Sequence, residues 1–176
     1  HRIRMIVAKL LQFARPTDYV GYLEPIAAET LVQDSLLLVG HLLRRTAIAV
    51  TQHMDSQRRV VSNKGELQQV LINLLVNAIQ AMPDGGVLTI ACEDWDEAGM
   101  PVGICLSVTD TGAGIPPEHL NKLFEPFFTS DKIGGNGLGL WVSQNIVERY
   151  GGYLGAENRA EGGSRFSIWL RLEPLG

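Results

Sequence analysis

The sequence predicts a two-layer α/β sandwich with a mixed sheet. Segments with helical spacing of apolar residues alternate irregularly with short β-rich segments. Strand patterns are joined in pairs by short turns, and such hairpins give antiparallel neighbours rather than a doubly wound parallel sheet. The chain has 176 residues, of which 45% are hydrophobic, so it can bury a core without a disulfide or a metal.

The first expected element is an amphipathic helix at 2–13. Its apolar residues recur at helical spacing, and Arg15-Pro16 ends it because a residue before proline avoids the α region. The segment is basic and has no acidic residue, and its apolar stripe needs a partner helix. Residues 17–25 are expected to be turn-like. A helix follows at 28–45, and its basic end suits the helix dipole.

Two strands and the longest helix are expected in the middle of the chain. The segments 46–51 and 58–62 are β-rich and are separated by a polar stretch. A strong helical pattern at 65–82 is stopped by Pro83, and Asp84-Gly85-Gly86 forms the turn after it.

The remaining elements pair as hairpins or flank glycine-rich loops. Strands at 87–92 and 103–109 are joined by an acidic connection, and Glu161-Gly162-Gly163 joins the last two strands. Between these hairpins we expect a short helix at 116–123, an irregular loop at 124–136 and a helix at 137–150, with the last strands at 153–158 and 164–172.

Charge and composition exclude several function classes. Fifteen Lys and Arg against nineteen Asp and Glu give a net charge of −4, the wrong sign for neutralising nucleic-acid phosphates. No apolar run of about 18 residues and no leader pattern is found, so we expect no membrane contact and a cytoplasmic location, although a parent protein could be membrane-anchored. Cys92 and Cys105 suit no metal motif, and they are either two buried thiols or a hairpin disulfide.

The helix at 65–82 carries a narrow polar stripe on an otherwise apolar cylinder. Its members are Glu66, Gln69, Asn73, Asn77 and Gln80. Asparagine is a poor helix former, so two of them four residues apart need a reason. Their side chains offer a carbonyl oxygen to a hard cation and amide protons to a phosphate. The alternative is that they satisfy backbone groups inside the core.

Two glycine-rich segments are candidate ligand loops. Asp110-Thr111-Gly112-Ala113-Gly114-Ile115 follows a strand, and its carboxylate can accept a hydrogen bond from an exocyclic amine, although the same pattern also serves as a plain turn. The run 134–140 begins a helix whose free N–H groups suit phosphates, unless it is only a flexible loop tip. It is neither a Walker nor a Rossmann motif.

Together and in this order, these segments resemble the catalytic and ATP-binding domain of sensor histidine kinases, in the wider family of gyrase, Hsp90 and MutL ATPases. The similarity covers roughly residues 45–172. The opening segment 4–16 is similar to the end of the second helix of the kinase's dimerisation and phosphotransfer hairpin, in the class that includes nitrogen-regulation sensors. The matching segments are 69–78 (N box), 110–115 (first glycine box), Phe124-Glu125-Pro126-Phe127-Phe128 (F box), 135–140 (second glycine box) and 162–166 (last glycine box). The resemblance implies a Bergerat-type fold, with a mixed, mostly antiparallel sheet packed on three helices. It also implies a catalytic domain at 17–176, preceded at 1–16 by the end of a dimerisation and phosphotransfer helix.

The resemblance implies ATP and Mg²⁺ as cofactors and assigns residues to them. Asn77 is expected to bind Mg²⁺. Asn73 faces the phosphates as the catalytic position, where gyrase-like and Hsp90-like relatives commonly have a glutamate. An amide is no general base, which favours phosphoryl transfer over hydrolysis. Asp110 would accept the adenine amino group, with Ser164 standing where threonine is usual. The other implied nucleotide contacts are Gly112, Gly114, Ile115, Phe124, Phe128, Lys132, Gly135, Gly137, Leu138, Gly139 and Leu140.

Two positions depart from the family pattern. Asp131 occupies the place where relatives of this class often have lysine, which shifts the basic residue to Lys132. Tyr150 precedes Gly151-Gly152 at a position where histidine is common.

The implied reaction moves the γ-phosphoryl group of ATP to a histidine on a dimerisation hairpin missing from this chain. From there the group passes to an aspartate of a response-regulator receiver domain. None of His1, His41, His53 and His119 has the sequence setting of a phosphoacceptor, so the chain should not autophosphorylate unaided. The expected partners are the regulator and the protein's own hairpin, in a homodimer. The alternatives are an anti-sigma-factor-like Ser/Thr kinase and a nucleotide-binding pseudokinase scaffold.

Overall fold

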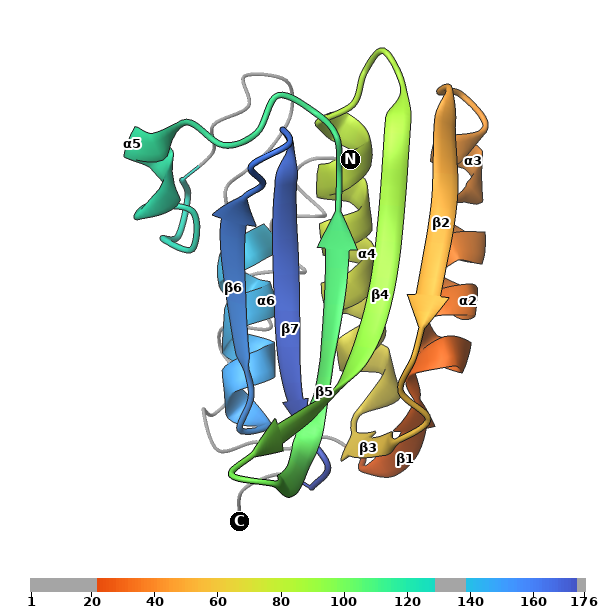
Figure 1. The fold of residues 1–176 in the computed structure, drawn as a ribbon, viewed down its shortest axis with the longest axis vertical. Coiled ribbons are helices and arrows are strands. Elements are labelled where there is room, and N and C mark those ends of the chain that lie inside the picture. Colours follow the sequence, from red (N-terminus) through yellow and green to blue (C-terminus); the bar gives the residue numbers. More distant parts are fainter. Residues whose placement is uncertain (1–21, 129–138, 174–176) are drawn as a thin grey trace.

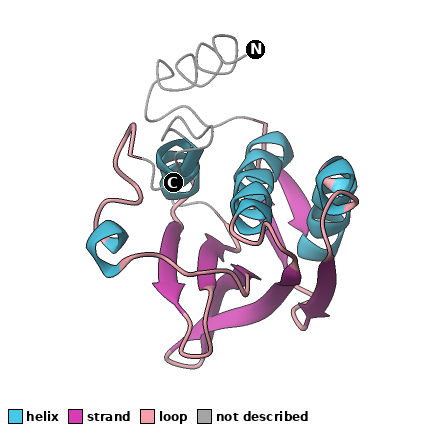
Figure 2. Ribbon diagram, turned by 90° about the horizontal axis from the view of Figure 1, so that it is seen from above, coloured by secondary structure: helices cyan, strands magenta, loops and turns pink. Residues whose placement is uncertain are grey.

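The computed structural model describes residues 22–128 and 139–173, which form a five-stranded sheet covered on one face by a layer of helices and a small two-stranded sheet (Figures 1 and 2). The helix expected at 2–13 lies outside this range. The described elements are β1 (Glu24–Ala27), α2 (Ala28–Leu38), α3 (Gly40–Leu43), β2 (Ile48–Met54), β3 (Arg59–Ser62), α4 (Lys64–Gln80), β4 (Gly86–Glu97), β5 (Met100–Thr109), α5 (Pro117–Leu120), α6 (Gly139–Arg149), β6 (Tyr153–Asn158) and β7 (Ser164–Arg171).

The main sheet has the strand order β2-β4-β5-β7-β6 in the described residues. Strand β2 runs parallel to β4, and the other three pairs are antiparallel. Helices α2, α4 and α6 lie on one face, with α4 in the middle of the layer (Figure 2). The predicted two-layer sandwich with a mixed, mostly antiparallel sheet on three helices is therefore confirmed.

The core lies between the sheet and α4. Alternate residues of each strand point toward the helices, so Leu106 of β5 and its partner Ile168 of β7 are both buried. Helix α4 presents a broad apolar surface to them, including the fully buried Leu71 and Leu74. Its first turn is capped by Asn63, whose side chain accepts a hydrogen bond from the Glu66 N–H.

Residues near the start of the described chain form a strand that the sequence did not indicate. Strand β1 pairs with β3 in a separate two-stranded sheet, where Ile26 lies opposite Val60. The turn-like reading of 17–25 was therefore wrong for Glu24 and Pro25. Proline cannot donate to a strand ladder, but a short strand with only one neighbour tolerates it. The strand expected at 58–62 thus joins β1, while the strand expected at 46–51 joins β4.

The single helix predicted at 28–45 is two helices. Helix α2 ends at Leu38 and α3 begins at Gly40, with Val39 between them at φ −97° and ψ 6°. Val39 is 2% exposed, so its side chain anchors the break in the core. The next residue is Gly40, and because glycine is unfavourable inside a helix, the predicted single helix is weakest at this point.

The β4–β5 hairpin is longer than predicted, because most of the acidic connection at 93–99 is strand. The turn consists of Ala98 and Gly99, both with positive φ (50° and 76°), as a two-residue type I′ turn requires. The far end of the hairpin bends across the sheet (Figure 1), where Trp95 contacts Trp169 edge-on at 5.5 Å. Arg58 fixes this end by donating to the Trp95 carbonyl at 3.1 Å.

The two cysteines lie on opposite faces of the hairpin. Cys92 is opposite Leu106 in the register, whereas Cys105 is opposite Glu93, one position further along. Both are free, so the disulfide alternative is contradicted. Burial raises the pKa of the Cys92 thiol to about 12 and that of Cys105 to about 11, with neighbouring acidic groups adding to the effect.

Candidate functional site

Three segments meet at the end of the sheet that lies uppermost in Figure 1. They are the C-terminal end of α4, the loop after β5 and the turn between β6 and β7. Their backbones approach so closely that only glycine fits at the contacts. A Cβ on Gly112 would lie 2.2 Å from the Ala81 carbonyl oxygen, and one on Gly163 would lie 2.0 Å from that of Asp110.

Asp110 is the buried centre of this junction, with 2% of its surface exposed. Its Oδ1 accepts hydrogen bonds from the backbone N–H groups of Gly112 at 2.9 Å and Ser164 at 3.3 Å. Its Oδ2 accepts one from the Ser164 hydroxyl at 2.8 Å. A carboxylate has about four acceptor positions, so Asp110 is held in one orientation with capacity for one further donor. The two residues that the family resemblance assigns to the base are therefore in direct contact.

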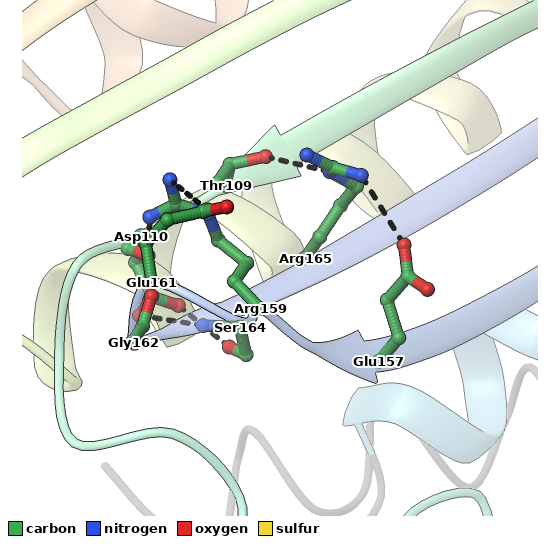
Figure 3. Close-up of polar contacts among 8 residues, drawn as sticks. All are labelled: Thr109, Asp110, Glu157, Arg159, Glu161, Gly162, Ser164 and Arg165. Carbon is green, nitrogen blue, oxygen red and sulfur yellow. Dashed lines mark hydrogen bonds and ion pairs between the residues drawn. The ribbon is translucent and has the colours of Figure 1, made fainter.

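An arginine that sequence analysis did not single out supports this junction (Figure 3). Arg159 donates to the carbonyl oxygens of Asp110 at 3.4 Å and Gly162 at 3.1 Å, and it pairs with Glu161 at 2.9 Å. The β6–β7 turn is therefore fastened to the start of the loop after β5 through side chain and backbone. No sequence motif predicts this role of Arg159, because its hydrogen-bond partners are backbone carbonyl oxygens, which every residue has.

Helix α4 divides its polar stripe between a neighbouring helix and the junction. The Asn73 amide nitrogen donates to the Gly139 carbonyl at 3.3 Å and to the Ser143 hydroxyl at 3.1 Å, both on α6. This contact to a backbone carbonyl is the alternative that the sequence left open for the stripe. One turn later, the half-buried Asn77 side chain makes no hydrogen bond within the described residues. Asn77 lies one helical turn before Ala81, the residue whose carbonyl oxygen approaches Gly112.

A single amide suits a Mg²⁺ ion that is shared with a nucleotide. Mg²⁺ takes oxygen ligands and commonly uses one or two protein groups together with substrate phosphates and waters. The Asn77 side chain carries an oxygen of that type in the last turn of α4, four residues before the Ala81 that contacts Gly112. Within the described ranges, no cluster of three or more His, Cys, Asp or Glu side chains could hold a metal by itself.

The start of α4 carries a buried ionic cluster. Glu66 Oε2 accepts from Arg149 at 2.7 Å and Oε1 accepts from the Tyr150 hydroxyl at 2.7 Å. The Glu66 and Arg149 side chains are only 9% and 10% exposed. Tyr150, the departure from the family's usual histidine, thus acquires a structural role. This cluster at the start of α4 and the Asn73 contacts in its middle hold α6 against α4 at two points along the helix.

The F box begins the segment between the junction and α6. Phe124 and Phe128 pack against the core, and Phe128 meets the ring of His119 edge-on at 5.2 Å. Phe127 is 66% exposed and has a positive φ of 66°. Gly139 and Leu140 begin α6. The predicted contacts Lys132, Gly135, Gly137 and Leu138 lie outside the described residues.

Most of the chain matches a known protein family. Residues 62–174 match the family described as histidine kinase-, DNA gyrase B-, and HSP90-like ATPase. This match covers well over half of the chain, and the chain belongs to that family.

Individual relatives narrow the comparison to sensor kinases. The chain is 36% identical over 182 residues to the sensor histidine kinase ZraS of Escherichia coli strain K12, covering 99% of this chain and 37% of ZraS. It thus spans little more than a third of that relative. The solved catalytic domain of the histidine kinase ThkA is 30% identical, with a TM-score of 0.76, and the match covers 87% of this chain and 99% of that domain.

A second ThkA structure holds the kinase in complex with the response regulator protein TrrA. Our chain matches it with a TM-score of 0.78 and 27% identity, over 98% of this chain and 48% of that one.

In the described part of our chain, no helix is both long and apolar enough to cross a membrane.

Proposed function

We propose that this chain is the ATP-binding catalytic part of a sensor histidine kinase. It would transfer the γ-phosphoryl group of ATP to a histidine on a dimerisation hairpin, from which an aspartate of a response regulator receives it. Residues 1–16 would be the end of that hairpin and 17–176 the catalytic domain. The observation that carries the proposal is the buried Asp110 carboxylate, oriented by Ser164 and two backbone N–H groups with one acceptor position left. A donor-bearing base such as adenine suits that position.

The residues around Asp110 give the rest of the site its roles. Asn77 would hold Mg²⁺, which supplies positive charge against the phosphates during transfer. The glycine-rich segment before α6 would present backbone N–H groups to them. Gly112, Gly114 and Ile115 would line the base, and Phe124 and Phe128 would anchor the chain that leads toward the phosphates.

Asn73 is the proposed catalytic position, and its contacts favour transfer over hydrolysis. Its amide nitrogen is already used by Gly139 and Ser143 of α6, so its carbonyl oxygen is the atom left for a ligand or a water. An amide oxygen has no useful basicity at neutral pH and cannot deprotonate a water. A protein nucleophile that brings its own reactivity, such as a histidine, needs only positioning and charge stabilisation.

Calorimetry with a non-hydrolysable ATP analogue, with and without Mg²⁺, tests the site directly. We expect binding that Mg²⁺ strengthens, and we expect Asn77→Ala to remove the Mg²⁺-dependent part while thermal unfolding stays unchanged. An affinity that is equally Mg²⁺-dependent in the variant would refute the metal role.

Asp110→Asn tests the base. The variant replaces an acceptor by an N–H group that opposes the adenine amino group, so we expect the preference for adenine over guanine nucleotides to fall. The same preference in the variant and the parent would contradict this assignment.

Phosphoryl transfer separates the proposed kinase from its alternatives. Labelled γ-phosphate should move from ATP to a supplied histidine-kinase hairpin, and a hairpin without the phosphoacceptor histidine is the control. Nucleotide binding without transfer would favour the pseudokinase scaffold. Label on a serine or threonine of a supplied anti-anti-sigma factor would favour the Ser/Thr kinase.

A further inference from the structure

The loop after β5 is held at both ends by one pair of residues on another hairpin. Asn158 ends β6 and Ser164 begins β7, and the two lie directly opposite each other in the strand register. Ser164 holds the start of the loop through Asp110. Asn158 holds its far end, because its Oδ1 accepts from the Ile115 N–H at 2.7 Å and its Nδ2 donates to the Ile115 carbonyl at 2.7 Å.

The contact of Asn158 imitates a strand partner. A side-chain amide has one carbonyl and one N–H₂ group, so it can engage both polar groups of a single residue as a neighbouring peptide would. The two residues are 43 positions apart in sequence. Gly114 has a φ of +83°, and a Cβ there would lie 3.0 Å from Asn158 Oδ1. The glycine therefore permits both the turn of the loop and the close approach of the amide.

The position of Asn158 separates this contact from the stability of the core. Asn158 is exposed, and both of its hydrogen bonds go to a loop. The loop between Gly112 and Gly114 has no strand or helix to fix its shape. Because Asn158 and Ser164 are paired in the β6–β7 register, the strand pair sets the distance between the two ends of this loop.

We propose that Asn158 is a positioning residue for nucleotide binding. Its amide holds Ile115 at a fixed distance from Asp110, so that the glycine arc between them is preformed before the base enters. The inference rests on the proposed function, because it assumes that this loop receives adenine. Preforming the loop removes an ordering cost from binding, so the contact acts on affinity rather than on folding.

The first test is calorimetric binding of the non-hydrolysable ATP analogue with Mg²⁺ to the parent chain and to Asn158→Ala. We expect the dissociation constant to rise about tenfold, because the loop must then be ordered on binding, with the melting temperature nearly unchanged. Failure of the parent to bind refutes the proposed function itself. Equal affinity of parent and variant refutes only the role of Asn158, as does a loss of affinity matched by a loss of the fold.

Asn158→Asp provides a readout that a purely structural role does not move. An ionised carboxylate keeps the acceptor but faces the Ile115 carbonyl without a donor. A protonated carboxyl has one donor and one acceptor and restores both hydrogen bonds. The charged neighbours in this turn, Arg159 with Glu161 and Glu157 with Arg165, are the same in parent and variant.

We expect Asn158→Asp to bind the analogue about tenfold more weakly than the parent at pH 7.5 and to recover part of this loss as the pH falls toward about 4, where an aspartate with the usual pKa of about 3.9 is half protonated. Taking the ratio to the parent at each pH cancels the titration of the nucleotide. Asn145→Asp is the matched control, since Asn145 is exposed on α6 and its amide donates to the Trp141 carbonyl of the same helix. Its ratio should stay near one. A pH-independent ratio for Asn158→Asp, or the same trend in the control, would overturn the proposal.

Discussion

Glu66→Gln should destabilise the domain far more than its conservative chemistry suggests. The substitution keeps the shape of the side chain and one of its two acceptor oxygens, but it removes the charge that Arg149 faces at 2.7 Å. Both side chains are about nine-tenths buried, at 9% and 10% exposure. Removing one member of a buried ion pair costs about 3–5 kcal/mol, because the other charge stays buried without a partner. We expect about 3 kcal/mol here, since the glutamine carbonyl oxygen still accepts from Arg149 and its N–H₂ group can donate to the Tyr150 hydroxyl oxygen.

Urea unfolding followed by circular dichroism measures this loss, and a melting temperature lower by about 6–12 °C should accompany it. The matched control is Lys64→Gln in the same helical turn. Lys64 pairs with Asp34 at 3.1 Å, but both side chains are 41% exposed, so its loss should cost about 0–1 kcal/mol. If Glu66→Gln costs no more than Lys64→Gln, the buried cluster does not stabilise the α4–α6 contact and our reasoning fails.

Two further predictions concern the glycines and the thiols. Gly163→Ala should destabilise the domain by about 1–3 kcal/mol or more in urea unfolding and abolish nucleotide binding. The added Cβ would lie 2.0 Å from the Asp110 carbonyl oxygen, and the residue would have to keep a φ of +81°. The control is Gly155→Ala, whose Cβ would have nothing within 4 Å and which should change the free energy of unfolding by less than about 0.5 kcal/mol. The raised pKa values of Cys92 and Cys105, about 12 and 11 against 9.0, mean that unfolded thiols ionise first as the pH rises, so stability should fall above pH 9. Cys92→Ala should flatten this fall, and parallel pH profiles of parent and variant would contradict the assignment.

The sequence indicates those parts of the fold that depend on local patterns. The turns predicted at Asp84-Gly85-Gly86, after the helix, and at Glu161-Gly162-Gly163, between the last two strands, are present, and their glycines have positive φ. Helix α4 follows its apolar periodicity from Lys64 to Gln80. Asp110 and Ser164 were assigned through the order of the family motifs, and the structure places them in direct contact.

The parts that the sequence missed depend on distant partners or on weak local signals. Strand β1 has four residues including Pro25, too few for a periodicity. The break at Val39 follows from burial of that side chain, which a helical pattern cannot distinguish from an uninterrupted helix. Asn158 lies 43 residues from Ile115, and Arg149 lies 83 residues from Glu66. Such pairs are visible only once the strands and helices are packed.

The polar stripe of α4 shows why the site could be located from sequence while its internal division could not. One narrow stripe holds Glu66, Asn73 and Asn77, and periodicity alone gives all three the same status. In the structure Glu66 and Asn73 face α6 and fasten it, whereas the Asn77 side chain makes no hydrogen bond within the described part of the chain. Helix α6 follows directly after the glycine-rich segment proposed to bind phosphates. Through Glu66 and Asn73, the stripe fixes the position of α6 and therefore the end of the glycine-rich segment. Through Asn77, it carries the amide proposed to bind the metal. A shift of α6 along α4 would therefore move the proposed phosphate-binding segment relative to the proposed metal ligand.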